Sequence, residues 1–165
     1  MLQCSCLLLL LSSVVYCNEL ETTNRREFCP LPCSLPLVSL GGTDYYFHIS
    51  SKLTWMEAYQ VCSVNGLRLL SIETVEEDRL IKRAIAGSGE VFWTSGNDLE
   101  VEGEFVWRST GQRFNYTGWG NGEPQNHADH EHCVFLGHWS GDAKVYWLDA
   151  PCMWKHFFIC EKKEM

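Results

Sequence analysis

Basic residues are scarce in this sequence. It has 13 Lys and Arg against 21 Asp and Glu, which gives a formal net charge of −8 at pH 7. A protein that binds nucleic acid needs a basic face to neutralise phosphates, so this balance argues against nucleic acid as a partner. An acidic surface suits divalent cations or simply favours solubility.

Charged side chains are absent from residues 1–17, which have an apolar centre from Leu7 to Val15. This run is shorter than the ~20 residues that span a bilayer, so it predicts a secretory signal peptide cleaved near Cys17. No later stretch of the sequence is long and apolar enough to cross a membrane. We therefore expect a secreted, extracellular protein. The expected organisation is a signal peptide at 1–17, a polar and proline-rich arm at 18–43, and a folded domain at 44–163.

The cysteine count depends on the signal peptide. The sequence has nine cysteines, and removal of Cys4, Cys6 and Cys17 with the signal leaves an even set. In an oxidising compartment such a set predicts disulfides rather than metal-binding thiolates. Spacing alone does not choose among the pairings. The remaining cysteines are Cys29, Cys33, Cys62, Cys133, Cys152 and Cys160.

Two helices are expected in the first half of the domain, after an aromatic strand at 45–49. Thr54 and Glu57 form a capping box for a helix that runs to about Asn65. Its predicted inner face is Met56, Tyr59 and Cys62. A second helix follows Glu73 and Thr74, with Glu76, Glu77, Lys82 and Arg83 facing water. Its predicted inner stripe is Val75, Leu80, Ile81, Ala84 and Ile85.

Short strands follow the helices, and between them lies a long segment with little periodic pattern. The strands are predicted at 91–94, 105–108, 133–136, 144–148 and 156–160, and the irregular segment covers 109–132. A loop of that length in a compact domain is usually functional or disordered, and the rings of Phe114 and Trp119 argue against disorder. Its last part reads GNGEPQNHADHEHC (120–133), a concentration of carboxylates, amides and histidines.

Five local motifs follow one another in the second half of the chain. They are Phe92–Gly96, Glu123-Pro124-Gln125, Glu131 two residues before Cys133, Trp147-Leu148-Asp149 and Phe157–Glu161. In this order they resemble the C-type lectin domain family, in particular its secreted single-domain members of the invertebrate kind, whose motifs are a Trp-Ile-Gly-Leu strand, Glu-Pro-Asn, the Glu before the Cys, Trp-Asn-Asp and the closing strand. The match covers residues 44–162 and implies an α+β fold: two helices packed on small antiparallel sheets, with a long ligand-binding loop braced by disulfides.

The resemblance implies disulfides Cys62–Cys160 and Cys133–Cys152. Cys29 and Cys33 fit the family less well, and they pair either with each other or with a second chain. Pro124 matches the family's cis proline, which directs its two neighbours to the same side. Calcium takes six to eight hard oxygen ligands, and the resemblance implies a primary calcium and carbohydrate site that grips vicinal sugar hydroxyls. Its ligands would be Glu123, Gln125, Glu131 and Asp149.

Two departures from the family pattern affect this primary site. Gln125 replaces Asn and reaches one methylene further, while Leu148 replaces an Asn that in the family ligates calcium and donates to the sugar. The order of carboxylate and then amide at 123 and 125 resembles the mannose-type motif. An auxiliary calcium site also maps onto the sequence, and the alternative is that its first two members are ordinary turn residues. The auxiliary set is Asp98, Glu102, Asn126 and Glu131.

Three histidines, His127, His130 and His132, lie in the same loop and raise the alternative of a zinc site. Because an extended loop gives this spacing no common face, we expect them to be solvated or to partner the carboxylates. Trp139 is the expected exposed aromatic contact, whereas Trp93, Trp107, Trp119 and Trp147 are expected in the core.

The leading functional hypothesis is a calcium-dependent lectin for microbial or cell-surface glycans. The runner-up is a domain of the same fold that binds protein, or binds sugar without calcium. An enzyme is not expected, since HExxH, Gly-x-Ser-x-Gly and the P-loop are absent from the sequence.

Asn115 begins an Asn-x-Ser/Thr sequon and is the expected glycosylation site. Lectins gain avidity by clustering, so a homo-oligomer is an alternative to a monomer that the sequence leaves undecided.

Overall fold

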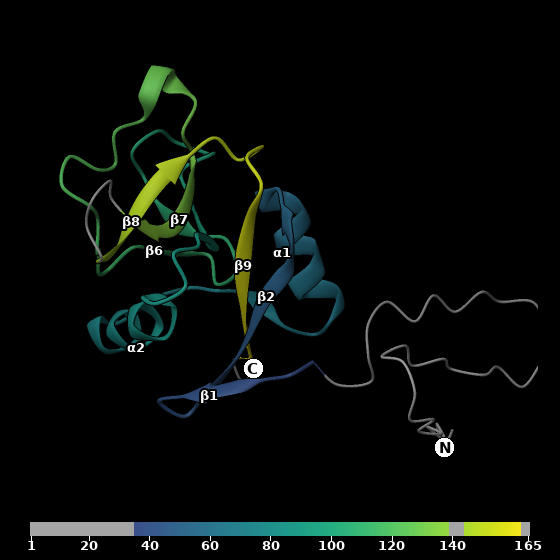
Figure 1. Ribbon diagram of the computed structural model, residues 1–165. Helices are drawn as coiled ribbons and strands as arrows, with labels where there is room; N and C mark the ends of the chain where they lie inside the picture. Colours follow the sequence, from purple (N-terminus) through teal and green to yellow (C-terminus); the bar gives the residue numbers. More distant parts are fainter. Residues whose placement is uncertain (1–34, 139–143, 163–165) are drawn as a thin grey trace, which may run out of the picture. The chain divides into compact units, whose positions relative to one another are not determined.

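The computed structural model describes residues 35–138 and 144–162 (Figure 1). The predicted signal peptide, most of the arm, the Cys29–Cys33 pair and Trp139 lie outside this part of the chain. The elements are β1 Val38–Leu40, β2 Thr43–Leu53, α1 Trp55–Val64, β3 Arg68–Leu69, α2 Val75–Ile85, β4 Phe92–Asn97, β5 Val106–Trp107, β6 Gln112–Arg113, the 3₁₀ helix η1 His127–Asp129, β7 Cys133–His138, β8 Val145–Ala150 and β9 His156–Lys162.

Helix α1 begins at the predicted capping box. Glu57 Oε2 accepts the backbone N–H of Thr54 at 2.9 Å, and the Thr54 hydroxyl accepts the backbone N–H of Glu57 at 3.5 Å. The predicted inner face was wrong in one member, because Met56 is 57% exposed and its neighbour Trp55 is buried. The Trp55 indole N–H donates to Thr94 O at 2.8 Å, which turns this residue, and not Met56, toward the sheet.

Helix α2 also departs from its predicted faces. Ile81 and Ile85 are buried as expected, but Val75 is 65% exposed and Ala84 faces solvent. The inner face instead contains Asp78, whose carboxylate lies 2.8 Å from the ammonium nitrogen of Lys82. Lys82, predicted to face water, is therefore drawn inward by a buried charge that hydrophobic periodicity does not reveal.

The strands form one connected sheet. Its main path runs β1-β2-β9-β4-β5-β6, β3 pairs with β9, and β7 joins β4 to β8. All pairs are antiparallel except β4 with β9, which is parallel. Strand β1 lies inside the segment 18–43 that the sequence predicts as an arm, and it pairs with β2.

Two hydrophobic cores occupy the two faces of this sheet. Successive residues alternate between the cores, as the period of two in a strand requires: Phe92 joins one core and Trp93 the other. One core packs against Ile81 and Ile85 of α2, and the second packs against Trp55 and the rest of the inner face of α1. In Figure 1 the helices accordingly lie on opposite sides of the β2–β9 pair.

Two disulfides brace the fold, and both join the cysteines that the family resemblance pairs. Cys62–Cys160 links α1 to β9, and Cys133–Cys152 links the start of β7 to the turn after β8. In the chain-entropy account, the loops of 98 and 19 residues that they close correspond to about 4–5 and about 3 kcal/mol of stabilisation. The shorter bridge sits directly beside the polar loop. Among the described residues, no helix combines the length and the apolar character needed to cross a membrane.

Candidate metal and carbohydrate site

Strand β8 carries the base of the long loop. The backbone N–H of Trp147 donates to Gly118 O at 3.1 Å, and the N–H of Gly120 donates to Trp147 O at 2.9 Å. A Cβ on Gly118 would lie 2.7 Å from Lys82 Nζ and 3.1 Å from Trp147 Nε1. Any larger residue would crowd these two side chains, so glycine favours the close approach of the loop at position 118.

Asp149, near the end of β8, is the central anion of the predicted primary site. Its side chain is buried, with the residue 3% exposed. Oδ1 accepts the backbone N–H of Gln125 at 3.0 Å, and Oδ2 accepts that of Asn126 at 2.8 Å. The loop segment after Pro124 is therefore held by both oxygens of one carboxylate, which fixes where the Gln125 side chain originates.

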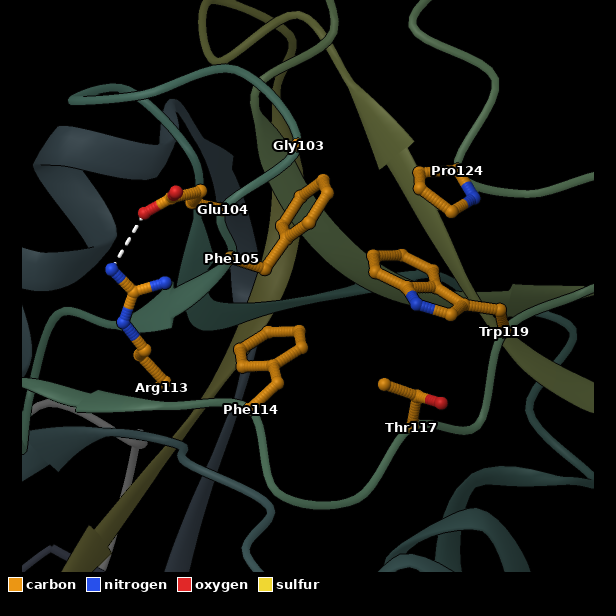
Figure 2. A pocket seen from close by; sticks show the side chains of 8 residues that line it. All are labelled: Gly103, Glu104, Phe105, Arg113, Phe114, Thr117, Trp119 and Pro124. Atoms are coloured by element: carbon orange, nitrogen blue, oxygen red, sulfur yellow. Dashed lines mark hydrogen bonds and ion pairs between the residues drawn. The ribbon is translucent and has the colours of Figure 1, made fainter.

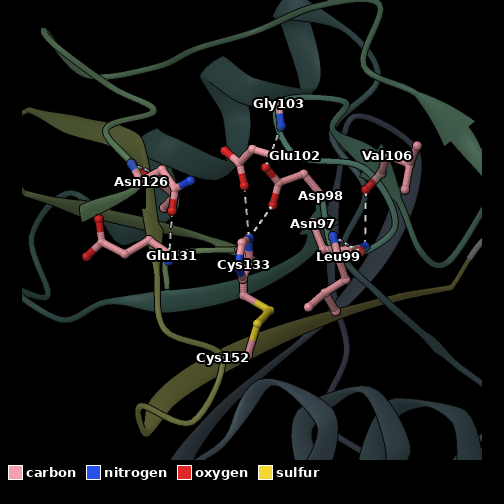
Figure 3. A network of polar contacts seen from close by, with 12 residues as sticks. Asn97, Asp98, Leu99, Glu102, Gly103, Val106, Asn126, Glu131, Cys133 and Cys152 are labelled. Atoms are coloured by element: carbon pink, nitrogen blue, oxygen red, sulfur yellow. Dashed lines mark hydrogen bonds and ion pairs between the residues drawn. A yellow bond between two sulfur atoms is a disulfide. The ribbon is translucent and has the colours of Figure 1, made fainter. Parts of the chain in front are cut away.

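Glu131 organises the second half of the loop. Its Oε2 accepts the backbone N–H of His127 at 2.8 Å, and its own N–H donates to Oδ1 of Asn126 at 3.3 Å (Figure 3). Asn126 has a φ of 42° and so lies in the left-handed region, which asparagine tolerates better than most residues. Glu131 is 6% exposed, so the loop brings a second buried carboxylate next to residues 125–127.

Glu123 is the third carboxylate, and its peptide bond to Pro124 is cis. Both of its carboxylate oxygens are buried without a hydrogen-bond partner among the described residues. Burial, then the nearby Asp149 carboxyl and more weakly Glu131, raises the pKa of Glu123 to about 8. A buried carboxylate needs a hydrogen bond or a counter-charge. Position 123 therefore fits a cation.

Leu148 precedes Asp149 in β8 but contributes no ligand atom. It is 8% exposed and pairs with Phe135 across β7 and β8. Its aliphatic side chain occupies the position where the resemblance implies an asparagine. The predicted primary set therefore lacks its fifth ligand. Among the described residues, its three carboxylates, Glu123, Glu131 and Asp149, do not form a group whose ligand atoms all lie within 4.8 Å of one another.

A second group of ligating side chains lies at the end of β4. His132 Nδ1 is 3.1 Å from Asp98 Oδ1 and 3.4 Å from Glu102 Oε2 (Figure 3). The three ligand atoms lie within 4.8 Å of one another. Among the described residues, no other group of three or more His, Cys, Asp or Glu side chains is this close together. The structure thus brings Asp98 and Glu102 together as the sequence predicts, but the partner that completes the group is His132.

His132 was considered in the sequence only as one of three loop histidines. Its neighbour Cys133 opens β7, and the backbone N–H of Asp98 donates to His132 O at 3.2 Å. The signal that distinguishes it is position: His132 directly precedes a disulfide-anchored strand, whereas His127 and His130 lie on the exposed turn. This difference in position identifies His132 as a metal ligand only once the pairing of β4 with β7 is known, because that pairing places His132 beside Asp98.

A cavity of about 380 Å³ adjoins Pro124 (Figure 2). Phe105, Phe114 and Trp119 present their rings to it, and an ion pair between Arg113 and Glu104 of 2.6 Å stands at its side. Such a combination of aromatic faces and paired charges offers stacking surface together with hydrogen-bonding groups. The cavity is continuous with the loop that carries Glu123 and Gln125, because Pro124 lies between them and lines it.

Comparison with known proteins gives a consistent result. A family model, the lectin C-type domain, matches residues 51–162. The galactose-specific lectin nattectin of Thalassophryne nattereri is 34% identical over 128 residues, which cover 74% of this chain and 75% of that protein. Lectin subunit alpha of Sarcophaga peregrina is 30% identical over 132 residues, and there the match spans 74% of this chain and 46% of the relative.

Solved structures agree. The carbohydrate-recognition domain of the mouse scavenger receptor C-type lectin aligns with a TM-score of 0.68 at 29% identity, covering 78% of this chain and 94% of that one. The C-type lectin domain of murine dendritic cell inhibitory receptor 2, solved with an N-glycan, aligns with a TM-score of 0.70 at 24% identity and supports the fold alone. It covers 81% of this chain and 100% of that domain. The expected α+β architecture is confirmed, and the chain belongs to the C-type lectin domain family.

Proposed function

We propose that this protein is a secreted lectin that binds terminal sugars with vicinal hydroxyls through calcium. The observation that carries the proposal is the buried carboxylate of Glu123, whose oxygens have no hydrogen-bond partner among the described residues. A dication beside Glu123 supplies the missing counter-charge for that group and for the buried Asp149 and Glu131. Oxygen donors of this kind are those that calcium prefers.

Four side chains would hold the ion: Glu123, Gln125, Glu131 and Asp149. Calcium supplies open coordination positions that two adjacent sugar hydroxyls can fill. The protein's own part is orientation, because Asp149 fixes the backbone at 125 and 126 while Glu131 fixes the backbone at 127. Carboxylates that ligate the ion also accept hydrogen bonds from the hydroxyls, and such charge-assisted bonds are short and strong.

The order of Glu123 and Gln125 supports a mannose-type preference, and the cavity next to Pro124 suits more than one sugar ring. A glycan whose terminal residue sits at 123 and 125 would continue over Pro124 into the space lined by Phe105 and Trp119. Sugar rings stack their apolar faces on aromatic side chains, and Arg113 and Glu104 offer partners for hydroxyls. Microbial and cell-surface glycans are the proposed targets.

Binding of protein, or of sugar without calcium, is the second candidate. The observation that favours it is Leu148, which is buried at the position where the family resemblance implies a calcium ligand. In that case Glu123 would serve as a protonated hydrogen-bond donor.

The deciding experiment is calorimetry of the mature protein. Calcium is titrated first, and then mannose and galactose are titrated with and without chelator. The proposal expects sugar binding that disappears with chelator, a preference for mannose, and loss of both calcium and sugar binding in Glu123→Gln. Glu100→Gln, on an exposed turn, is the matched control and should behave as wild type. Sugar binding that survives chelator would overturn the proposal in favour of the second candidate.

A further inference from the structure

The auxiliary group differs in chemistry from a calcium site. Calcium takes oxygen ligands, yet the side chain that faces both Asp98 and Glu102 is the imidazole of His132. Imidazole nitrogen suits zinc and the neighbouring transition metals. We propose that Asp98, Glu102 and His132 form a binding site for a zinc-class divalent metal, separate from the sugar site.

Glu131, which the family pattern places in a calcium site here, is not in the group of ligand atoms that lie within 4.8 Å of one another. Asn126 Oδ1 accepts the backbone N–H of Glu131, and Glu131 Oε2 accepts that of His127. These two side chains hold the polar loop in place. The donor set at Asp98 is therefore two carboxylates and one imidazole, which does not fit calcium and which matches the three protein ligands plus water of many zinc sites.

The distances suit a small tetrahedral ion. Zinc bonds of about 2.0–2.2 Å place neighbouring ligand atoms of a tetrahedron roughly 3.3–3.6 Å apart. The measured separations from His132 Nδ1 are 3.1 Å to Asp98 Oδ1 and 3.4 Å to Glu102 Oε2. Binding therefore asks for little rearrangement, apart from release of the Nδ1 proton that a hydrogen bond to either carboxylate requires.

Two of the three ligands are held rigidly. The Asp98 side chain is 0% exposed, and its Oδ2 accepts the backbone N–H of Gly103 at 2.9 Å. His132 precedes Cys133, which is fixed by its disulfide and by pairing with Asn97. Supporting contacts of this kind orient ligands and raise metal affinity. The Glu102 side chain is 55% exposed, which leaves a path from solvent for the ion and for a bound water.

Metal titration of the mature protein tests the site. Zinc should bind with a measurable heat, and cobalt should give the visible absorption of a tetrahedral nitrogen–oxygen site. His132→Asn should weaken zinc binding at least roughly tenfold and abolish the cobalt spectrum. His130→Asn, a neighbouring exposed histidine, should leave both unchanged. Equal zinc binding by the two variants, or no zinc binding by wild type, would overturn the proposal and leave an ordinary hydrogen-bonded cluster.

A second variant separates this site from the sugar site. Glu123→Gln should retain the cobalt spectrum of wild type even though it loses calcium-dependent sugar binding. Loss of the spectrum in Glu123→Gln, with the spectrum intact in His132→Asn, would place the metal at position 123 and overturn the assignment to His132. His132→Asp should exchange zinc preference for calcium preference, because it converts the set to oxygen alone.

Discussion

The indole N–H of Trp147 donates a hydrogen bond of 2.7 Å to Oδ1 of Asp78. The other carboxylate oxygen of Asp78 accepts the hydroxyl of Tyr116 at 2.9 Å and faces Lys82 Nζ at 2.8 Å. Lys82 in turn donates to Gly118 O at 3.3 Å. One buried carboxylate thus joins α2 to β8 and to the beginning of the long loop, so the position of the loop depends on the helix.

Asp78→Ala should destabilise the fold by about 3–5 kcal/mol, because it leaves a lysine, an indole and a phenol without their shared acceptor. Chemical denaturation followed by tryptophan fluorescence measures the loss. Glu76→Ala removes an exposed carboxylate of the same helix, which pairs with Arg79 on the surface, and its midpoint should match that of wild type. Equal midpoints for the two variants would show that the network contributes little.

His156 should make stability depend on pH. Burial, and then the charge of Lys52, lowers the pKa of His156 to about 4, and its Nε2 is buried without a hydrogen-bond partner among the described residues. The unfolded chain titrates near pH 6.5 and binds the proton first. The contribution of His156 to stability is therefore complete above about pH 6.5 and is lost as the pH is lowered toward 4.

Urea denaturation of wild type and His156→Gln between pH 7 and 4.5 measures this contribution. Other groups titrate in both proteins, so the informative quantity is the difference between the two pH profiles. The variant should lose less stability than wild type as the pH falls. Parallel profiles would contradict the prediction.

Leu148→Asn should raise calcium affinity. An amide oxygen at this position would supply the ligand that the primary set lacks, and the ligand set tunes calcium affinity. The change also buries a polar group in place of an aliphatic one, so a loss of stability of about 1–3 kcal/mol is expected. Leu148→Ala is the control for the loss of packing. Calcium calorimetry should show a gain in affinity for Leu148→Asn and none for Leu148→Ala. An unchanged calcium affinity in Leu148→Asn would indicate that the ion lies elsewhere.

Arg113→Ala should weaken binding of an oligosaccharide roughly 2- to 12-fold, the range that corresponds to one hydrogen bond, and leave a methyl monosaccharide unaffected. Arg113 lines the cavity beside Pro124 and is not one of the proposed calcium ligands. Arg108→Ala, also exposed, is the matched control. Equal loss for the monosaccharide would show that Arg113 acts on the primary site or on folding.

The elements that the sequence predicts well are those with strong local signals. The Thr54–Glu57 capping box and the aromatic and β-branched runs of β4, β8 and β9 can each be recognised from a few consecutive residues. Strand β5 lies inside the strand predicted at 105–108, whereas β3 and β6, of two residues each, were not predicted. Such short strands have no pattern of their own and exist only because longer neighbours pair with them.

The site was predictable where motif order fixed it and unpredictable where contacts cross the chain. Glu123, Pro124, Gln125 and Asp149 follow from motifs. The contact of His132 with Asp98 joins residues 34 positions apart, and the burial of Asp78 depends on a tryptophan 69 positions away. Both contacts depend on tertiary packing, and the local pattern assigned Asp78 to neither face of α2.

The antiparallel register of β2 with β9 pairs Asp44 with Lys162. The start of β2 and the end of β9 therefore lie side by side, at the bottom of Figure 1, while η1, drawn in green, lies at the top. A tether or label attached at the end of β9 would enter from one pole of the domain. A chip or bead coupled through such a tether should then display the polar loop outward, unobstructed for ligands arriving from solution.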